Sequence, residues 1–180
     1  MSRVPLLDAD GADPALAPVL ERFAREGREP IAFYRALANA PDLLDAYSGF
    51  ARAVRARGDA TLRETLTLRV AFLTDSDYEW SHHHKLALAA GVAEEKVNAI
   101  PEWKGSDRFD EREQAALACI DELHENAVTD ATFAELSRHF DTAEVVWVIA
   151  LGSLYELVER MVQALGVPVE PSYQPYLRSE

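Results

Sequence analysis

Two residues near the middle of the chain have the types and the spacing for acid–base chemistry. Glu79 and His83 are four positions apart, so on a helix they lie on one face, one turn from each other. Leu86, Ala87 and Ala90 follow His83 at helical spacing, which predicts that the pair lies on the apolar, core-facing stripe. A carboxylate and an imidazole that are buried together need each other as partners. The pattern therefore indicates a buried site for proton transfer.

Glu64 is the third candidate, and it precedes the pair on a separate predicted helix that ends near residue 73. If the two helices form an antiparallel hairpin with its bend at residues 74–76, Glu64 can face His83. Two carboxylates around one imidazole would raise the pKa of the ring and fix its tautomer. We therefore expect Glu64, Glu79 and His83 to form one catalytic relay.

The same residues allow other interpretations. The consecutive histidines His82, His83 and His84 spread around a helix and cannot converge on one ion, and the chain has no HExxH motif, so we expect no metal site. No phosphate loop or dinucleotide fingerprint is present, and we expect no cofactor. A purely structural Glu79–His83 pair that fixes helix register remains an alternative.

Composition limits the class of protein. A length of 180 residues with 48% hydrophobic content predicts a single domain over residues 1–180, with a core at about 30–168 and an extended tail at 169–180. The net charge of −13 argues against nucleic acid or an anionic membrane as a partner. No long apolar stretch or signal-like start is present, so we expect a cytoplasmic protein. The single cysteine, Cys119, can form neither an internal disulfide nor a CxxC pair.

Apolar residues recur at three- and four-residue spacing almost throughout, which predicts an all-α fold. The expected helices cover residues 13–26, 31–38, 41–57, 59–73, 77–90, 92–100, 111–126, 129–140 and 142–165. The last one is apolar around most of its circumference at residues 145–151, which favours a central helix, a subunit interface or both. We therefore predict a homo-oligomer. The proline-rich segment after residue 168 is predicted to be non-helical, and it could cover a neighbouring subunit.

Most of residues 30–168 resembles the carboxymuconolactone decarboxylase and alkylhydroperoxidase D-like superfamily. The resemblance lies in Glu64-x-x-x-Leu68-Arg69-Val70-Ala71, in Tyr78-Glu79-Trp80-x-x-His83-x-x-Leu86-Ala87-x-x-Ala90-Gly91, in the segment 109–117, and in Tyr155-x-x-x-x-Arg160-x-x-x-x-Leu165-Gly166-Val167. It implies a helical bundle that assembles into trimers or hexamers.

Redox members of this superfamily have a glutamate, then Cys-x-x-Cys, then a histidine four residues after the second cysteine. The glutamate and histidine correspond to Glu64 and His83, but Ser76 and Glu79 occupy the two cysteine positions. Without the thiols a dithiol peroxidase cycle cannot operate. Of this redox site, the resemblance therefore implies only the proton relay of Glu64 and His83 in this chain.

We expect from these features an acid–base enzyme, of the lyase or isomerase type, that acts on a small carbonyl, lactone or carboxylate compound. Tyr78 and Trp80 could line its pocket, and Arg69 or Arg160 could bind a substrate carboxylate. The alternatives are a peroxidase-related protein that has lost its redox cysteines and a non-catalytic oligomeric binding module.

Overall fold

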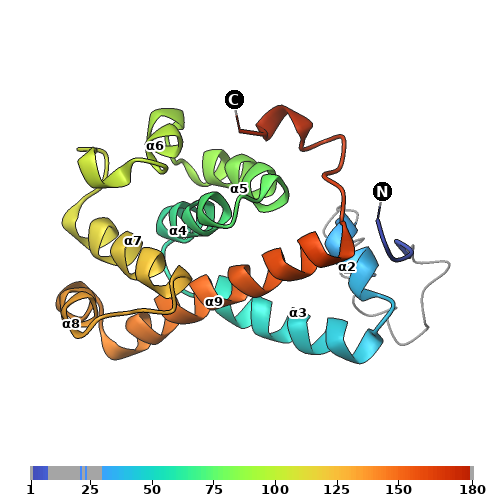
Figure 1. Ribbon diagram of the computed structural model, residues 1–180, viewed down its shortest axis with the longest axis horizontal. Coiled ribbons are helices and arrows are strands. Elements are labelled where there is room, and N and C mark those ends of the chain that lie inside the picture. Colours follow the sequence, from blue (N-terminus) through green and yellow to red (C-terminus); the bar gives the residue numbers. More distant parts are fainter. Residues whose placement is uncertain (1, 8–20, 22, 24–29, 179–180) are drawn as a thin grey trace.

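The computed structural model describes residues 2–7, 21, 23 and 30–178, and within these ranges the regular structure is entirely helical (Figure 1). Its longer helices are α2 (Ala32–Leu37), α3 (Pro41–Arg55), α4 (Ala60–Leu73), α5 (Asp77–Ala90), α6 (Glu94–Ala99), α7 (Glu111–His124), α8 (Asp130–His139) and α9 (Thr142–Leu165). Two single 3₁₀ turns, η3 (Trp103–Gly105) and η4 (Gln174–Tyr176), complete the set. The predicted all-α class is confirmed. The helix expected over residues 13–26 lies mostly outside the described residues.

The two helices that matter most for the site begin and end at strong capping residues. The Ser76 side chain accepts a hydrogen bond from the Glu79 backbone N–H and starts α5, and Gly91 ends it at a φ of 95°. Asp141 starts α9 with a capping box, and Gly166 ends it at a φ of 62°. The bounds predicted for both helices, 77–90 and 142–165, agree with the structure.

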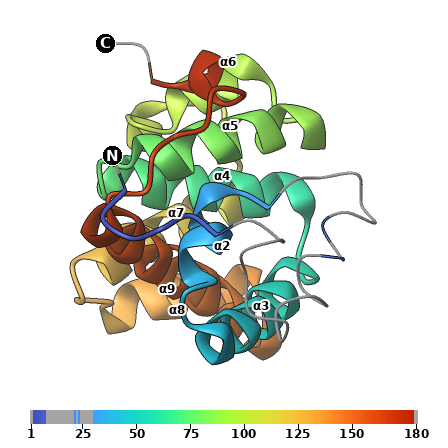
Figure 2. The same ribbon diagram turned by 90° about the vertical axis from the view of Figure 1, so that its right-hand side faces the viewer.

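Helix α9 lies at the centre of the bundle and packs against α3, α4, α5, α7 and α8. Helices α4 and α5 form the expected antiparallel hairpin and lie side by side across α9 (Figures 1 and 2). The fully buried side chains include Phe33, Leu44, Leu66, Leu68, Ile100, Leu117, Ile120, Leu136, Leu151, Leu154 and Tyr155. The hairpin and α9 thus share one apolar core, which holds the candidate site residues in place.

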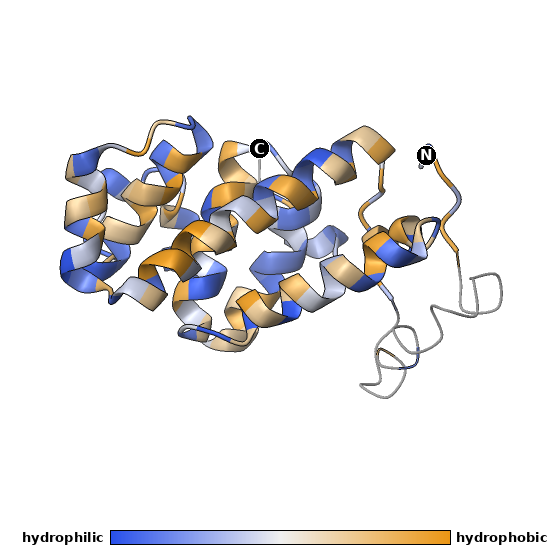
Figure 3. Cartoon of the chain, turned by 90° about the horizontal axis from the view of Figure 1, so that it is seen from below, coloured by the Kyte–Doolittle hydropathy of each residue, from blue (hydrophilic) through white to orange (hydrophobic). Residues whose placement is uncertain are grey.

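One face of α9 is not covered within the chain. Val146 on α9 is 62% exposed and Phe50 on α3 is 51% exposed. Both border an open apolar groove between α3 and α9, and the apolar residues of these helices can be followed in Figure 3. Within the single chain, residues 145–151 are therefore not buried on every side, and Val146 lies on the face that the predicted subunit interface would cover. The central position of α9 is confirmed, whereas the homo-oligomer stays a prediction.

The turn between α3 and α4 is fixed by a glycine. Gly58 has a φ of 70°, and a Cβ atom at this position would lie 2.4 Å from ring atoms of Trp147. Trp147 in turn donates a hydrogen bond from Nε1 to the carbonyl oxygen of Val54 at 2.9 Å. Asp59 then caps α4 by accepting from the backbone N–H groups of Thr61 and Leu62. A residue other than glycine at position 58 would strain the backbone and displace the indole ring.

The C-terminal segment folds back onto the chain's own α5 (Figure 2). It contains the turn η4, so the expectation of no helical structure after residue 168 was wrong for three residues. Pro175 is tolerated because it occupies the start of this short turn, where no backbone N–H donor is required. None of the described helices is both long enough and apolar enough to cross a membrane.

Candidate active site

The hairpin of α4 and α5 brings Glu64 next to His83. His83 Nδ1 lies 2.7 Å from Glu64 Oε2, and the other oxygen of Glu64 accepts a hydrogen bond from Arg63 Nε at 3.0 Å. Both oxygens of Glu64 are therefore occupied, and the carboxylate is held in one orientation. The predicted contact between Glu64 and His83 is present.

The second nitrogen of the His83 ring is directed to Glu79. Nε2 of His83 lies 3.2 Å from Glu79 Oε2, which is an ion-pair distance without the geometry of a hydrogen bond. In the part of the chain that the structure describes, this buried oxygen has no hydrogen-bond partner. Because Nδ1–H is used to donate to Glu64, Nε2 is the nitrogen that can exchange a proton, and Glu79 is the carboxylate beside it.

Electrostatics favour the charged forms of His83 and Glu64. Burial disfavours charge on His83, but the Tyr155 oxygen and the Glu64 carboxylate outweigh it and raise the pKa of His83 well above its usual value of 6.5. Burial would raise the pKa of Glu64, but His83 and Arg63 lower it below its usual value of 4.5. The arrangement at neutral pH is an imidazolium ion between two acidic side chains.

A cavity of about 230 Å³ borders these groups. It is lined by Ile31, Phe33, Tyr47, Arg55, Arg63, Glu64, Glu79, His82, His83, Leu86, Tyr155 and Tyr173. All three predicted catalytic residues belong to this wall. Its volume lies below the roughly 300–1,000 Å³ of pockets for drug-sized ligands, so a substrate of about one ring fits it. Leu86, expected on the core-facing stripe, is instead 44% exposed because the cavity opens beside it.

Several cavity residues were not predicted from the sequence. Arg55 on α3 donates hydrogen bonds from its guanidinium to the hydroxyls of Tyr34, at 3.4 Å, and Tyr47, at 3.3 Å. Tyr155 on α9 packs the edge of its ring against His83, with 4.7 Å between the ring centroids. Tyr155 belongs to the closing motif of the sequence resemblance, and this was the available signal. Nothing in the local sequence of Arg55 pointed to the site.

The two arginines that we expected at the substrate lie elsewhere. Arg69 Nε donates to Asp121 Oδ1 at 2.6 Å, and its Nη1 donates to two backbone carbonyls. Arg160 is largely exposed and pairs with Glu156 at 3.4 Å. Neither side chain lines the cavity, so the expected substrate contacts are corrected. Arg69 ties α4 to α7, and Arg160 lies on the outer face of α9.

Tyr78 and Trp80 also lie outside the cavity wall. Tyr78 accepts a hydrogen bond from the Phe33 backbone N–H at 3.1 Å and donates to Glu170 at 3.4 Å, so it links α5 to α2 and the tail. Trp80 is buried and borders a separate open pocket beneath the C-terminal segment. The aromatic lining that we expected is present, but other residues provide it.

His82 forms part of the cavity wall together with the tail. Its Nδ1 donates to the Tyr78 carbonyl at 2.7 Å, and its Nε2 lies 3.0 Å from Glu170 Oε2. The ring of Tyr173 lies against the His82 ring, with the centroids 3.7 Å apart. Glu170 also accepts a hydrogen bond from the Ala32 backbone N–H at 2.6 Å. The C-terminal segment therefore closes one side of the cavity.

Thiol and metal chemistry have no geometric basis within the described ranges. Cys119 is buried on α7, and burial together with the nearby Glu122 raises the pKa of its thiol to about 11. It does not line the cavity. No group of three or more histidine, cysteine, aspartate or glutamate side chains in these ranges has the arrangement of a metal site.

Comparisons with known proteins agree with this architecture. Residues 41–122 match the model of the Carboxymuconolactone decarboxylase family. A comparison with curated proteins found no match. Among solved structures, the apo debrominase Bmp8 superposes with a TM-score of 0.82 at 23% identity, over 97% of this chain and 95% of its own.

Two further structures carry the alkylhydroperoxidase designation or a related one. An uncharacterized peroxidase-related protein from Ralstonia eutropha JMP134, described as an alkylhydroperoxidase AhpD core, gives a TM-score of 0.79 at 19% identity over 96% of this chain and 94% of its own. A peroxidase-related protein from Silicibacter sp. TM1040 gives 0.81 at 14% identity over 98% and 96%. At these identities the likeness shows the fold. Residues 41–122, which carry both helices of the hairpin, match the carboxymuconolactone decarboxylase family model, and the chain has the alkylhydroperoxidase D-like helical fold.

Proposed function

We propose that this protein is an acid–base enzyme that moves a proton on a small carbonyl, lactone or carboxylate compound. The observation that carries the proposal is the position of His83 between Glu64 and Glu79 in the wall of a cavity. A buried histidine between two acids has a strongly perturbed proton affinity, and such groups concentrate at functional sites. The family match and the debrominase with the same fold support an enzyme.

Each of the three residues has a distinct role in the proposed reaction. Glu64 is held in one orientation because both of its carboxylate oxygens are already bound. It therefore orients the His83 ring, and its contact with Nδ1 keeps that nitrogen protonated. Glu79 has a buried oxygen without a hydrogen-bond partner among the described residues, and it accepts the proton from the substrate carbon. His83 donates a proton from Nε2 to a second position of the substrate. In the complete reaction one C–H bond breaks and another forms, as in an isomerisation.

The same groups can serve a decarboxylation. Loss of carbon dioxide leaves an electron pair on carbon, and the imidazolium ion of His83 is the proton source beside it. A small ring fits the volume of the cavity. The debrominase Bmp8 has been crystallised with the single-ring compound 2,3,4-tribromopyrrole, which supports a ligand of this size.

Deuterium incorporation tests the proposal on a set of compounds from the proposed substrate classes. The protein is incubated in D₂O with small lactones, cyclic ketones and 2-oxo acids, and exchange at carbon is followed by NMR. We expect His83→Gln and Glu79→Gln to lower the exchange rate of any responsive compound by about 10²–10⁴-fold.

The chain offers a matched control. Glu135 and His139 on α8 form an i,i+4 pair at 3.1 Å, with the same residue types and spacing but at the surface. Glu135→Gln and His139→Gln should leave the exchange rate unchanged. The proposal fails if no compound exchanges above the rate in buffer, or if the control variants lose as much activity as the site variants. In that case the relay is a structural pair.

A further inference from the structure

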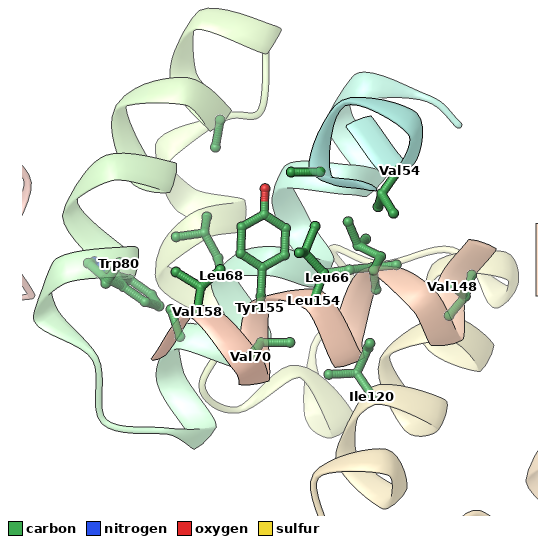
Figure 4. Close-up of a cluster of buried hydrophobic side chains, with 14 of the residues drawn as sticks. Val54, Leu66, Leu68, Val70, Trp80, Ile120, Val148, Leu154, Tyr155 and Val158 are labelled. Carbon is green, nitrogen blue, oxygen red and sulfur yellow. The ribbon is translucent and has the colours of Figure 1, made fainter. Parts of the chain in front are cut away.

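Among the described residues, the hydroxyl of Tyr155 is a buried polar group without a hydrogen-bond partner. Tyr155 is 2% exposed, and in the part of the chain described here its oxygen has no hydrogen-bond partner. Figure 4 shows the ring rising from α9 with the hydroxyl directed away from the helix. A buried hydroxyl that donates to nothing is destabilising, because it has lost its hydrogen bonds to water. Since Tyr155 also lines the cavity, a ligand there is the natural acceptor.

The same cavity wall holds a cation, Arg55. Arg55 extends from an exposed position on α3, and among the described residues no acidic side chain lies within ion-pair distance of it. Its contacts are the two tyrosine hydroxyls of Tyr34 and Tyr47. Arg63, the other arginine of the wall, is paired with Glu64. Arg55 is therefore the arginine of this wall that can neutralise a bound anion.

Tyr155 connects the two parts of the cavity. It lines the same cavity as Arg55 and His83, and the edge of its ring packs against the His83 ring with 4.7 Å between the centroids. A ligand oxygen that accepts from Tyr155 is then close to a cation on one side and to the proton-moving residues on the other. This juxtaposition is what stabilisation of a developing negative charge requires.

We propose that the Tyr155 hydroxyl and the Arg55 guanidinium form an oxyanion subsite, which holds the oxygen of an enolate or carboxylate while Glu79 and His83 move the proton at a neighbouring carbon. The subsite rests on the proposed function and specifies its substrate class as compounds that pass through an oxygen anion. The C–H bond breaks, its proton goes to Glu79, and its electron pair forms a C=C bond. The carbonyl electrons then move onto oxygen, which accepts a hydrogen bond from Tyr155.

Binding of a phenolate tests the subsite independently of catalysis. The probe is 4-nitrophenol, a single ring whose ionised oxygen mimics an enolate and whose absorbance distinguishes phenol from phenolate. We expect the wild-type protein to bind the ionised form preferentially. Tyr155→Phe and Arg55→Gln should each weaken this binding by about tenfold or more. Arg160→Gln, on the outer face of α9, is the matched control and should bind as the wild type does.

Folding of the variants is checked by near-UV circular dichroism. Tyr155→Phe removes a hydroxyl that makes no hydrogen bond to the described residues, so it should remain folded. Undiminished phenolate binding by both Tyr155→Phe and Arg55→Gln would overturn the subsite, as would a wild-type protein that binds no phenolate.

The two proposals fail in different ways. His83→Gln and Glu79→Gln should retain phenolate binding while they lose deuterium exchange. Phenolate binding without any exchange in the wild type would leave the subsite intact and refute the proton-transfer function. Exchange that survives in Tyr155→Phe and Arg55→Gln at the wild-type rate would refute the subsite and leave the function.

Discussion

Replacement of Glu64 or Glu79 by glutamine should affect stability very differently, although both are buried acids next to one histidine. Both oxygens of Glu64 accept short hydrogen bonds, one from His83 at 2.7 Å and one from Arg63 at 3.0 Å. Loss of one partner from a buried charge pair typically costs about 3–5 kcal/mol. Glu79 Oε2 lies 3.2 Å from His83 Nε2 and makes no hydrogen bond to the described residues, so Glu79→Gln loses one weaker contact and should lower stability by only about 1 kcal/mol.

Thermal unfolding gives the scale of the difference. For a chain of this length, 1 kcal/mol shifts Tm by about 2–4 °C, so Glu64→Gln should lower Tm by about 6–20 °C. Glu79→Gln should stay within about 4 °C of the wild type. Glu135→Gln, an exposed acid beside a histidine on α8, serves as the control for the loss of one negative charge.

The experiment compares urea and thermal unfolding of the three variants at pH 7 and at one protein concentration. Equal destabilisation by Glu64→Gln and Glu79→Gln would refute the separation into an orienting and a proton-accepting acid. An unchanged stability of Glu64→Gln would also refute it, because the two short contacts of Glu64 would then contribute nothing to the stability of the fold.

Three further predictions follow from the same structure. The raised pKa of His83 contributes stability that is complete below pH 6.5 and lost as pH rises through the folded-state pKa, while the lowered pKa of Glu64 contributes stability above pH 4.5 that is lost on acidification. Urea titrations across pH should therefore show a broad maximum, and His83→Gln should flatten its alkaline side. Peroxide assays with dithiol reductants should give background rates, and turnover abolished by Cys119→Ser would contradict the buried, high-pKa thiol. Light scattering should give a mass several times 20.0 kDa, which Val146→Glu should reduce, since that residue is exposed on the apolar groove; a monomeric wild type would remove the interface.

The sequence alone was sufficient to predict the hairpin of α4 and α5 and the contact between Glu64 and His83 that the hairpin carries. Periodicity, the Ser76 cap and the stops at Gly91 and Gly166 predicted α5 and α9 to the residue, because such signals act locally. The contact between Glu64 and His83 followed from the antiparallel hairpin alone. Such a pairing depends on only one turn and the length of two helices.

The cavity wall could not be predicted in the same way. Arg55 and Tyr155 come from helices outside the hairpin, so their positions depend on the packing of α3 and α9. Arg69 was assigned to the substrate because Asp121, the acid that neutralises it, lies on α7 and is recognised only once the helices are packed. Glu156, the partner of Arg160, lies four residues earlier on the same helix, so this pair could have been recognised in the sequence. An arginine is available to a ligand only when no acid reaches it, and this is a property of tertiary structure.

The groups proposed to move protons and many of the residues that shape the cavity come from different chain segments, which affects how this protein can evolve. The groups proposed to move protons lie on α4 and α5, whereas much of the cavity wall belongs to α2, α3, α9 and the C-terminal segment. Substitutions at Ile31 or Tyr173 can reshape the space for a ligand while the contacts of Glu64 with His83 stay unchanged. A new substrate preference can therefore arise by mutation in one part of the chain without any loss of the reaction chemistry held in another.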